Sequence, residues 1–271
     1  MASDSFYTIS TVHLQNNIFS ENQKNIETQS DVINLSYTKV LKDKHHIGIS
    51  VLYAATVGNE LRNGSINGKS FYSQGFQEPK FSYAYLAKTA KKNDGQILSY
   101  HLSLIPSFIE KKSGGEKSNQ AIGGNYISYE VLWGQTYSTW AGFIRLFGSR
   151  NFRALEKNMV SDTEYSSSGY STYSLTFIGR YKLNKKWNLF FSSGMQFVRD
   201  VDVTSSKKSS SALIQQGTGT TKDIGVSLTT KERRYSASLK TIKNQFFIDD
   251  SEGNYKGMFE RYTFTFSATF F

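Results

Sequence analysis

The sequence contains no cysteine and only two prolines. Without cysteine, neither a disulfide framework nor a thiolate metal site can form. Scarce proline suits extended strands, because proline inside a sheet removes a backbone hydrogen-bond donor. The sequence also lacks a run of about 18 apolar residues, which excludes a transmembrane helix. Its mean hydropathy of −0.45 resembles that of a soluble protein, but strands with one apolar and one polar face give similar averages.

The sequence also lacks a cluster of basic residues, although its formal net charge is +10. Basic proteins often bind nucleic acid, yet here the lysines and arginines are scattered in groups no larger than pairs such as Lys185 and Lys186. We therefore expect no nucleic-acid partner. The first residues, MASDSFY, show no charged stretch followed by an apolar one, so no signal peptide is recognised. If the protein is exported, we expect its signal to have been removed.

Aromatic residues are abundant, with 17 tyrosines and 20 phenylalanines, and many lie in alternating runs. Tyr173, Leu175 and Phe177, for example, alternate with Ser174 and Thr176. A period of two residues indicates a strand with one apolar face. Such runs occur at 6–14, 32–41, 47–57, 81–88, 98–104, 127–133, 140–146, 173–181, 187–197, 224–229, 234–240 and 261–270.

The connections between these runs alternate in length. Short ones are expected at 42–44, 93–95, 134–136, 184–186 and 231–233. Long ones are expected at 16–30, 58–79, 107–123, 149–169, 201–221 and 245–257. This alternation places all turns at one end and all loops at the other, as in transmembrane barrels.

These features predict an all-β fold: one transmembrane antiparallel up-and-down β-barrel of about 12 strands formed by residues 1–271. Its short turns and both termini would be periplasmic, and its long loops extracellular. A soluble β-sandwich also has alternating strands, but its connections need not alternate in length. A propeller would repeat about every 40 residues, and no such repeat occurs.

The last residues, RYTFTFSATFF, resemble the final strand of bacterial outer-membrane barrels, which typically end in an aromatic residue on an alternating apolar strand. The resemblance implies an outer-membrane location, with membrane lipid, lipopolysaccharide and the barrel-assembly machinery as partners. It also implies an assembly signal at Phe264, Phe266, Phe270 and Phe271. The apolar series through Phe270 is one residue out of phase with Phe271.

If the apolar face meets lipid, the polar face lines the lumen. Its charged members and one histidine are then Lys88, His101, Glu130, Arg145, Arg180, Arg234, Lys240 and Arg261. A mainly basic lining lowers the barrier for anions in a narrow pore. We therefore hypothesise a porin-like channel for passive diffusion of small hydrophilic solutes, preferentially anions. Alternatively, these side chains pair with one another or plug the lumen.

Two other functions stay open. His101 and Ser103 share a strand face, so the histidine could activate the hydroxyl. The pair is similar to the His-x-Ser of outer-membrane phospholipases and lipid A deacylases, where it faces lipid. Here the lipid face belongs to Tyr100, Leu102 and Leu104, so we predict no catalytic site. A binding or adhesion barrel with recognition loops is the remaining alternative.

The sequence shows no pattern for a metal or a cofactor. His45 and His46 are adjacent, and neighbouring residues of a strand point to opposite faces. No phosphate-binding glycine loop is present. We therefore expect no metal and no cofactor.

Overall fold

Every regular element in the described part of the chain is a β-strand. The computed structural model describes residues 5–20, 24–42, 44–62, 65–88, 94–113, 119–158, 163–199, 201–205, 211–250 and 253–271. The expected turns at 42–44 and 93–95 include Asp43 and Asn93, which lie outside these ranges. No helix in the described residues is long and apolar enough to cross a membrane.

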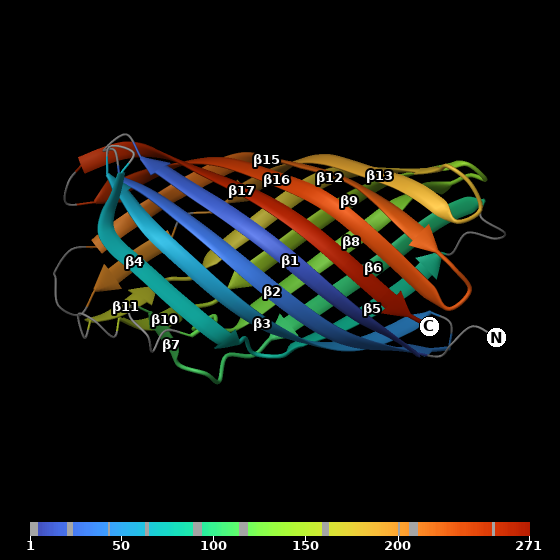
Figure 1. The fold of residues 1–271 in the computed structure, drawn as a ribbon, viewed down its shortest axis with the longest axis horizontal. Helices are drawn as coiled ribbons and strands as arrows, with labels where there is room; N and C mark the ends of the chain where they lie inside the picture. The colour runs from blue at the N-terminus through green and yellow to red at the C-terminus, as the bar shows by residue number, and fades with distance from the viewer. Residues whose placement is uncertain are drawn as a thin grey trace.

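Twelve antiparallel strands form a closed barrel (Figure 1). The first strand, β1 (Ser5–Ser20), pairs with β2 (Lys24–Leu41) and with the last strand, β17 (Gly253–Phe270), so the barrel wall has no free side. The wall continues through β3 (His45–Arg62), β5 (Lys80–Lys88), β6 (Gly95–Ile105), β8 (Tyr126–Thr136), β9 (Trp140–Asn151), β12 (Tyr170–Lys182), β13 (Trp187–Val198), β15 (Ser211–Thr229) and β16 (Arg233–Asp250). The predicted fold class and strand number are confirmed.

The fourth strand of the barrel is broken into β4 (Ser65–Phe76) and β5, and both pair with β3. Gly75 has a φ of 144°, a conformation that favours glycine. The amide of Gln77 still donates to the Leu52 carbonyl at 2.9 Å. Pro79 has no amide hydrogen to donate, so the ladder is interrupted there.

The alternation of residues on β12 shows why these sequences form a barrel wall. Leu175 is 37% exposed and Phe177 is 58% exposed, whereas Thr176 between them is 1% exposed. In a strand, successive side chains point to opposite faces. The large apolar side chains therefore cover the outside, and small polar ones are enclosed on the lumen side.

The short turns and both described chain ends lie at one end of the barrel, which we call the short-turn end (Figure 1). At the opposite, long-loop end, the wall is extended by four short strands. These are β7 (Lys111–Ser113), β10 (Ala154–Asn158), β11 (Thr163–Ser167) and β14 (Val201–Ser205). They pair in the order β7–β10–β11–β14–β15, and only the β7–β10 pair is parallel.

Several boundaries predicted from the sequence were wrong. Strands occupy most of the expected loops at 16–30, 58–79, 201–221 and 245–257, because β1–β4 and β15–β17 continue well beyond the apolar runs. The outer parts of β1 and β2 carry polar residues on both faces, and β16 carries the consecutive apolar residues Phe246, Phe247 and Ile248, so the period-two pattern used to find strands is absent there. The turn expected at 134–136 lies after Thr136, since β8 ends there and Tyr137 donates to the Trp140 carbonyl at 2.7 Å.

The outside of the barrel changes from apolar to charged along the strands. On β2, Ile33 and Leu35 are 49% and 52% exposed, and Leu41 stands near the short turn. The tilted strand from Ile33 to Leu41 spans about 20 Å along the barrel axis, close to the apolar height of a membrane barrel. Beyond Ile33, Asp31 pairs with His13 at 2.8 Å. We call the outer belt of apolar side chains, which on β2 runs from Ile33 to Leu41, the apolar band. The pair of Asp31 and His13 lies at its boundary toward the long-loop end.

Candidate functional site

Four charged side chains from four strands interact on the lumen side of the wall. Asp223 on β15 is the register partner of Lys240 on β16. Arg145 on β9 interacts electrostatically with both, and Arg261 on β17 interacts with Lys240. We call Arg145, Asp223, Lys240 and Arg261 the basic row. It holds three cationic groups and one carboxylate, so its net charge is positive.

Arg145 reaches this row across two neighbouring strands. Its register neighbour Thr176 pairs in turn with Gly194, and Gly194 pairs with Thr221 on the strand that carries Asp223. The Nη2 of Arg145 donates to the Thr176 hydroxyl at 3.5 Å. Because Gly194 has no side chain, the guanidinium can lie along the wall toward Asp223. The enclosure of Thr176 and Thr221 fits this placement.

Two polar atoms of the basic row are enclosed without a hydrogen-bond partner, the Nε of Arg145 and the Oδ1 of Asp223. A donor and an acceptor left unsatisfied are costly where water cannot reach them. Electrostatic attraction to Arg145 and Lys240 offsets part of this cost for Asp223.

Arg261 is fixed more firmly than the other basic groups. Its Nε donates to the Oδ1 of Asn16 at 2.6 Å, across the pairing of β17 with β1. Its guanidinium also lies 5.1 Å from the ring centre of Phe259. A hydrogen bond and a cation–π contact together hold the charge at a defined place in the lumen.

A second basic pair lies toward the short-turn end. Arg180 on β12 and Arg234 on β16 interact electrostatically with each other. Arg234 is the second residue of its strand, and its guanidinium lies 5.8 Å from the ring centre of Phe271. Cationic groups therefore occur at two levels of the lumen.

The opposite wall carries a mixed group of charges. His101 on β6 stands between Ala84 and Glu130 in the register, and His46 stands on the other side of Ala84. Glu130 interacts electrostatically with Lys80, and His101 with His46. The sequence predicted His101 and Glu130 as lumen residues but missed the rest of this group. Lys80 is the first residue of β5, directly after the break at residues 77–79, where the alternation is interrupted.

The hydrogen bond of His101 is not to the serine that the sequence suggested. Its Nε2 lies 3.0 Å from the hydroxyl of Ser99, whereas Ser103 stands in register with Ser82 and Ser128. Both Ser99 and Ser103 lie two residues from His101, so spacing alone gives them equal rank. Ser99 is 2% exposed, so a substrate carbonyl cannot reach its oxygen.

Lys88 lies apart from the other predicted lumen residues. The register shifts between Leu86 and Lys88, so that Lys88 stands opposite Leu98. Its Nζ donates to the Oε1 of Gln96 at 3.0 Å. A bulge of this kind re-aims the side chains that follow it. Lys88 therefore belongs to the end of the strand, beside the short turn.

The terminal phenylalanines occupy two different environments. Phe264 and Phe266 are 53% and 46% exposed on the outside of β17. Phe270 ends the strand opposite Tyr7, and Phe271 follows it with its amide donating to the Glu232 carbonyl at 3.0 Å. Their role as an assembly signal stays a prediction.

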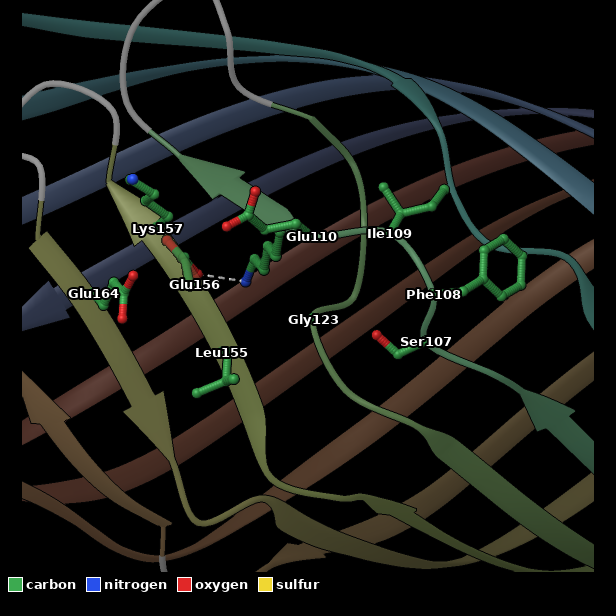
Figure 2. Close-up of a pocket in the computed structure, with 10 residues that line it drawn as sticks. Ser107, Phe108, Ile109, Glu110, Gly123, Leu155, Glu156, Lys157 and Glu164 are labelled. Carbon is green, nitrogen blue, oxygen red and sulfur yellow. Dashed lines mark ion pairs between the residues drawn. The ribbon is translucent and has the colours of Figure 1, made fainter.

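A separate cavity of about 350 Å³ lies at the long-loop end (Figure 2). It is lined by Ser107, Phe108, Ile109, Glu110, Lys111, Gly123, Leu155, Glu156, Lys157 and Glu164. The Nζ of Lys111 and the Oε2 of Glu156 form an ion pair at 2.6 Å, drawn as a dashed line in Figure 2. Its lysines and glutamates nearly balance, so this cavity has no strong preference for one sign of charge.

No group of three or more histidine, aspartate or glutamate residues in the described ranges is arranged to hold a metal ion.

The fold matches that of solved bacterial outer-membrane proteins. An outer-membrane channel from Pseudomonas putida F1 has 11% sequence identity and a TM-score of 0.66, over 100% of this chain and 97% of that one. The transport unit of the autotransporter AIDA-I from Escherichia coli has 9% identity and a TM-score of 0.57, over 99% and 90%. The translocator domain of the autotransporter NalP from Neisseria meningitidis has 7% identity and a TM-score of 0.51, over 100% and 89%.

No protein-family model and no curated protein sequence matches the chain. At such low identity, the structural likeness shows the fold alone. The structural neighbours are outer-membrane β-barrel proteins, as the resemblance of the last strand implied.

Proposed function

We propose that this protein is a channel of a bacterial outer membrane that lets small hydrophilic solutes, preferentially anions, diffuse through its lumen. The observation that carries the proposal is the basic row of Arg145, Asp223, Lys240 and Arg261. Three cationic groups facing one carboxylate leave a positive potential in the lumen. In a narrow pore with low-dielectric walls, such a potential attracts anions and repels cations.

The second basic pair supports the same direction of selectivity. Arg180 and Arg234 lie nearer the short-turn end than the basic row, so an anion meets cationic groups at successive levels. Several weak sites in series allow an ion to enter and still to leave, as conduction requires. Glu130 on the opposite wall, beside Lys80, reduces this potential without cancelling it.

The proposal includes an orientation, with the short turns and both termini in the periplasm and the long loops outside the cell. The extension of the wall by β4, β7, β10, β11 and β14 at the long-loop end, with short turns at the other end, supports it. It also includes contact with membrane lipid and lipopolysaccharide along the apolar band, and insertion by the barrel-assembly machinery. The outer-membrane fold of the structural neighbours is consistent with this setting.

Single-channel recording of the purified protein in planar bilayers tests the function. Under a KCl gradient, we expect discrete conductance steps and a reversal potential of the sign given by chloride permeation. A cation-selective reversal potential would refute the anion preference. A folded protein that shows no conductance would refute the channel and leave the binding barrel as the alternative.

A further inference from the structure

The extended wall at the long-loop end contains a seam. On one side the wall ends at β4, whose register pairing in the described residues is with β3. On the other side it ends at β7, which pairs there with β10. Between these two edges the described residues form no ladder of backbone hydrogen bonds.

A short segment, residues 119–122, bridges the seam, and we call it the strap. The amide of Asn119 donates to the Lys112 carbonyl at 3.0 Å, and the Oδ1 of Asn119 accepts from the Lys112 amide at 3.0 Å. The adjacent Gln120 contacts Ser73 on β4. Because neighbouring residues of the strap touch β7 and β4, it closes the gap between them.

The attachment of the strap to β4 and β3 depends on the Gln120 carboxamide. Its Nε2 donates to the Ser73 hydroxyl at 2.6 Å, to the Ser73 carbonyl at 3.2 Å and to the Thr56 hydroxyl at 3.1 Å. Thr56 also contacts the hydroxyl of Ser30 at 2.8 Å. Thr56 and Ser30 are on the polar, lumen-facing side of their strands. The anchor therefore lies at the lumen surface of the entrance.

Glu78, in the break between β4 and β5, provides the second anchor. Its Oε2 accepts from the Ile122 amide at 3.2 Å. The residue is 2% exposed, and its Oε1 has no hydrogen-bond partner. An enclosed oxygen without a partner is unfavourable, so release of the strap would restore its hydration. This makes the closed arrangement easier to open than a complete ladder.

The seam contrasts with the pairings between the long strands of the barrel. All 18 residues of β16 stand in register with β17. Across the seam, the hydrogen bonds of two side chains, Gln120 and Glu78, replace such a ladder. The seam is therefore one of the few places where the extended wall can open by breaking a small number of bonds, and the three-residue pairings of β7 with β10 and of β11 with β14 are the others.

We propose that the strap is a releasable closure of this seam, and that its anchors Gln120 and Glu78 set the size limit for solutes entering at the long-loop end. The size limit rests on the proposed channel function, whereas the release of the strap does not. An open seam widens the entrance beside β4. A closed one confines solutes to the lumen bounded by the strap.

Thiol labelling tests the release directly, because the chain has no cysteine of its own. Ala121 is 3% exposed, so a thiol in an Ala121→Cys variant is protected while the strap is closed. Adding Gln120→Ala and Glu78→Ala should speed reaction with a water-soluble maleimide by at least about tenfold, as expected from the loss of two or more hydrogen bonds. Gln96→Ala, which removes a carboxamide bonded to Lys88, is the matched control and should not change the rate.

Solute entry provides the second measurement. With both anchors removed, liposomes should admit neutral sugars larger than those that the parent channel admits. A Ser73→Cys/Gln120→Cys variant allows the strap to be linked to β4 with a short bifunctional thiol reagent. This link should return the size limit for sugars to the parent value. Equal labelling rates with and without the anchors would overturn the proposal. Faster labelling with an unchanged size limit would overturn the role in entry.

The two proposals can fail separately. If the parent protein conducts nothing, the channel function fails, and the labelling rates still decide whether the strap opens. If the parent conducts anions but the strap thiol stays protected in every variant, the channel stands and the releasable closure is refuted.

Discussion

Asp223 and Lys240 stand directly opposite each other on β15 and β16, on the lumen side of the wall. The carboxylate of Asp223 also interacts with Arg145, so one acidic group attracts two basic groups. This relationship lets several cations share a small volume without strong mutual repulsion, and it still leaves a positive balance.

Replacing Asp223 with asparagine should strengthen the anion preference. The substitution keeps the size of the side chain and removes the single negative charge of the basic row. We expect the chloride-to-potassium permeability ratio to rise by roughly twofold or more. Reversal potentials in a KCl gradient measure this ratio. A fall in the ratio would contradict the placement of Asp223 beside the ion path.

Glycine packing on β13 gives a prediction about stability. A Cβ at Gly194 would clash with the Leu175 carbonyl oxygen and would lie 2.8 Å from the Cα of Thr176, both backbone atoms. We expect Gly194→Ala to lower the free energy of unfolding by about 1–3 kcal/mol, because the backbone must shift. Urea titration in detergent micelles measures the change.

Gly142 supplies the control for that experiment. A Cβ there would meet only the Trp140 ring, at 3.4 Å, which is an ordinary contact. Gly142→Ala should therefore change the unfolding free energy by no more than about 0.5 kcal/mol. Equal effects of the two substitutions would argue against the close approach at Gly194.

The serine and histidine of β6 lead to a negative prediction. Ser99 holds the hydrogen bond of His101 but is enclosed, and Ser103 stands among other serines. We expect the purified protein to release no fatty acid from phospholipid vesicles, and Ser103→Ala to leave the conductance unchanged. Fatty-acid release that disappears in Ser103→Ala would establish the hydrolase instead.

Much of the fold was predictable because the apolar band imposes a strict pattern. Residues such as Leu175 and Phe177 must face outward, and Thr176 inward, wherever a strand crosses the band. Beyond it, both faces meet water and the pattern vanishes. The outer half of β2, around Glu27 and Gln29, was therefore mistaken for a loop.

The site was predictable only where alternation continues without interruption. Arg145, Lys240 and Arg261 follow it, but the bulge before Lys88 and the break before Lys80 disturb it. Alternation also cannot rank Ser99 against Ser103. The contacts of Gln120 with Thr56 and Ser73 join residues 64 and 47 positions apart, and no local pattern encodes them.

Charge reversal at Lys240 tests the central claim most directly, namely that the basic row determines which ions pass. Lys243 is on the outside of the same strand, paired with Glu260 at 2.7 Å, and provides the matched control. In a KCl gradient, Lys240→Glu should move the reversal potential toward the cation-selective side, while Lys243→Glu should leave it at the parent value. An unchanged reversal potential in Lys240→Glu, with the barrel still folded, would contradict the account.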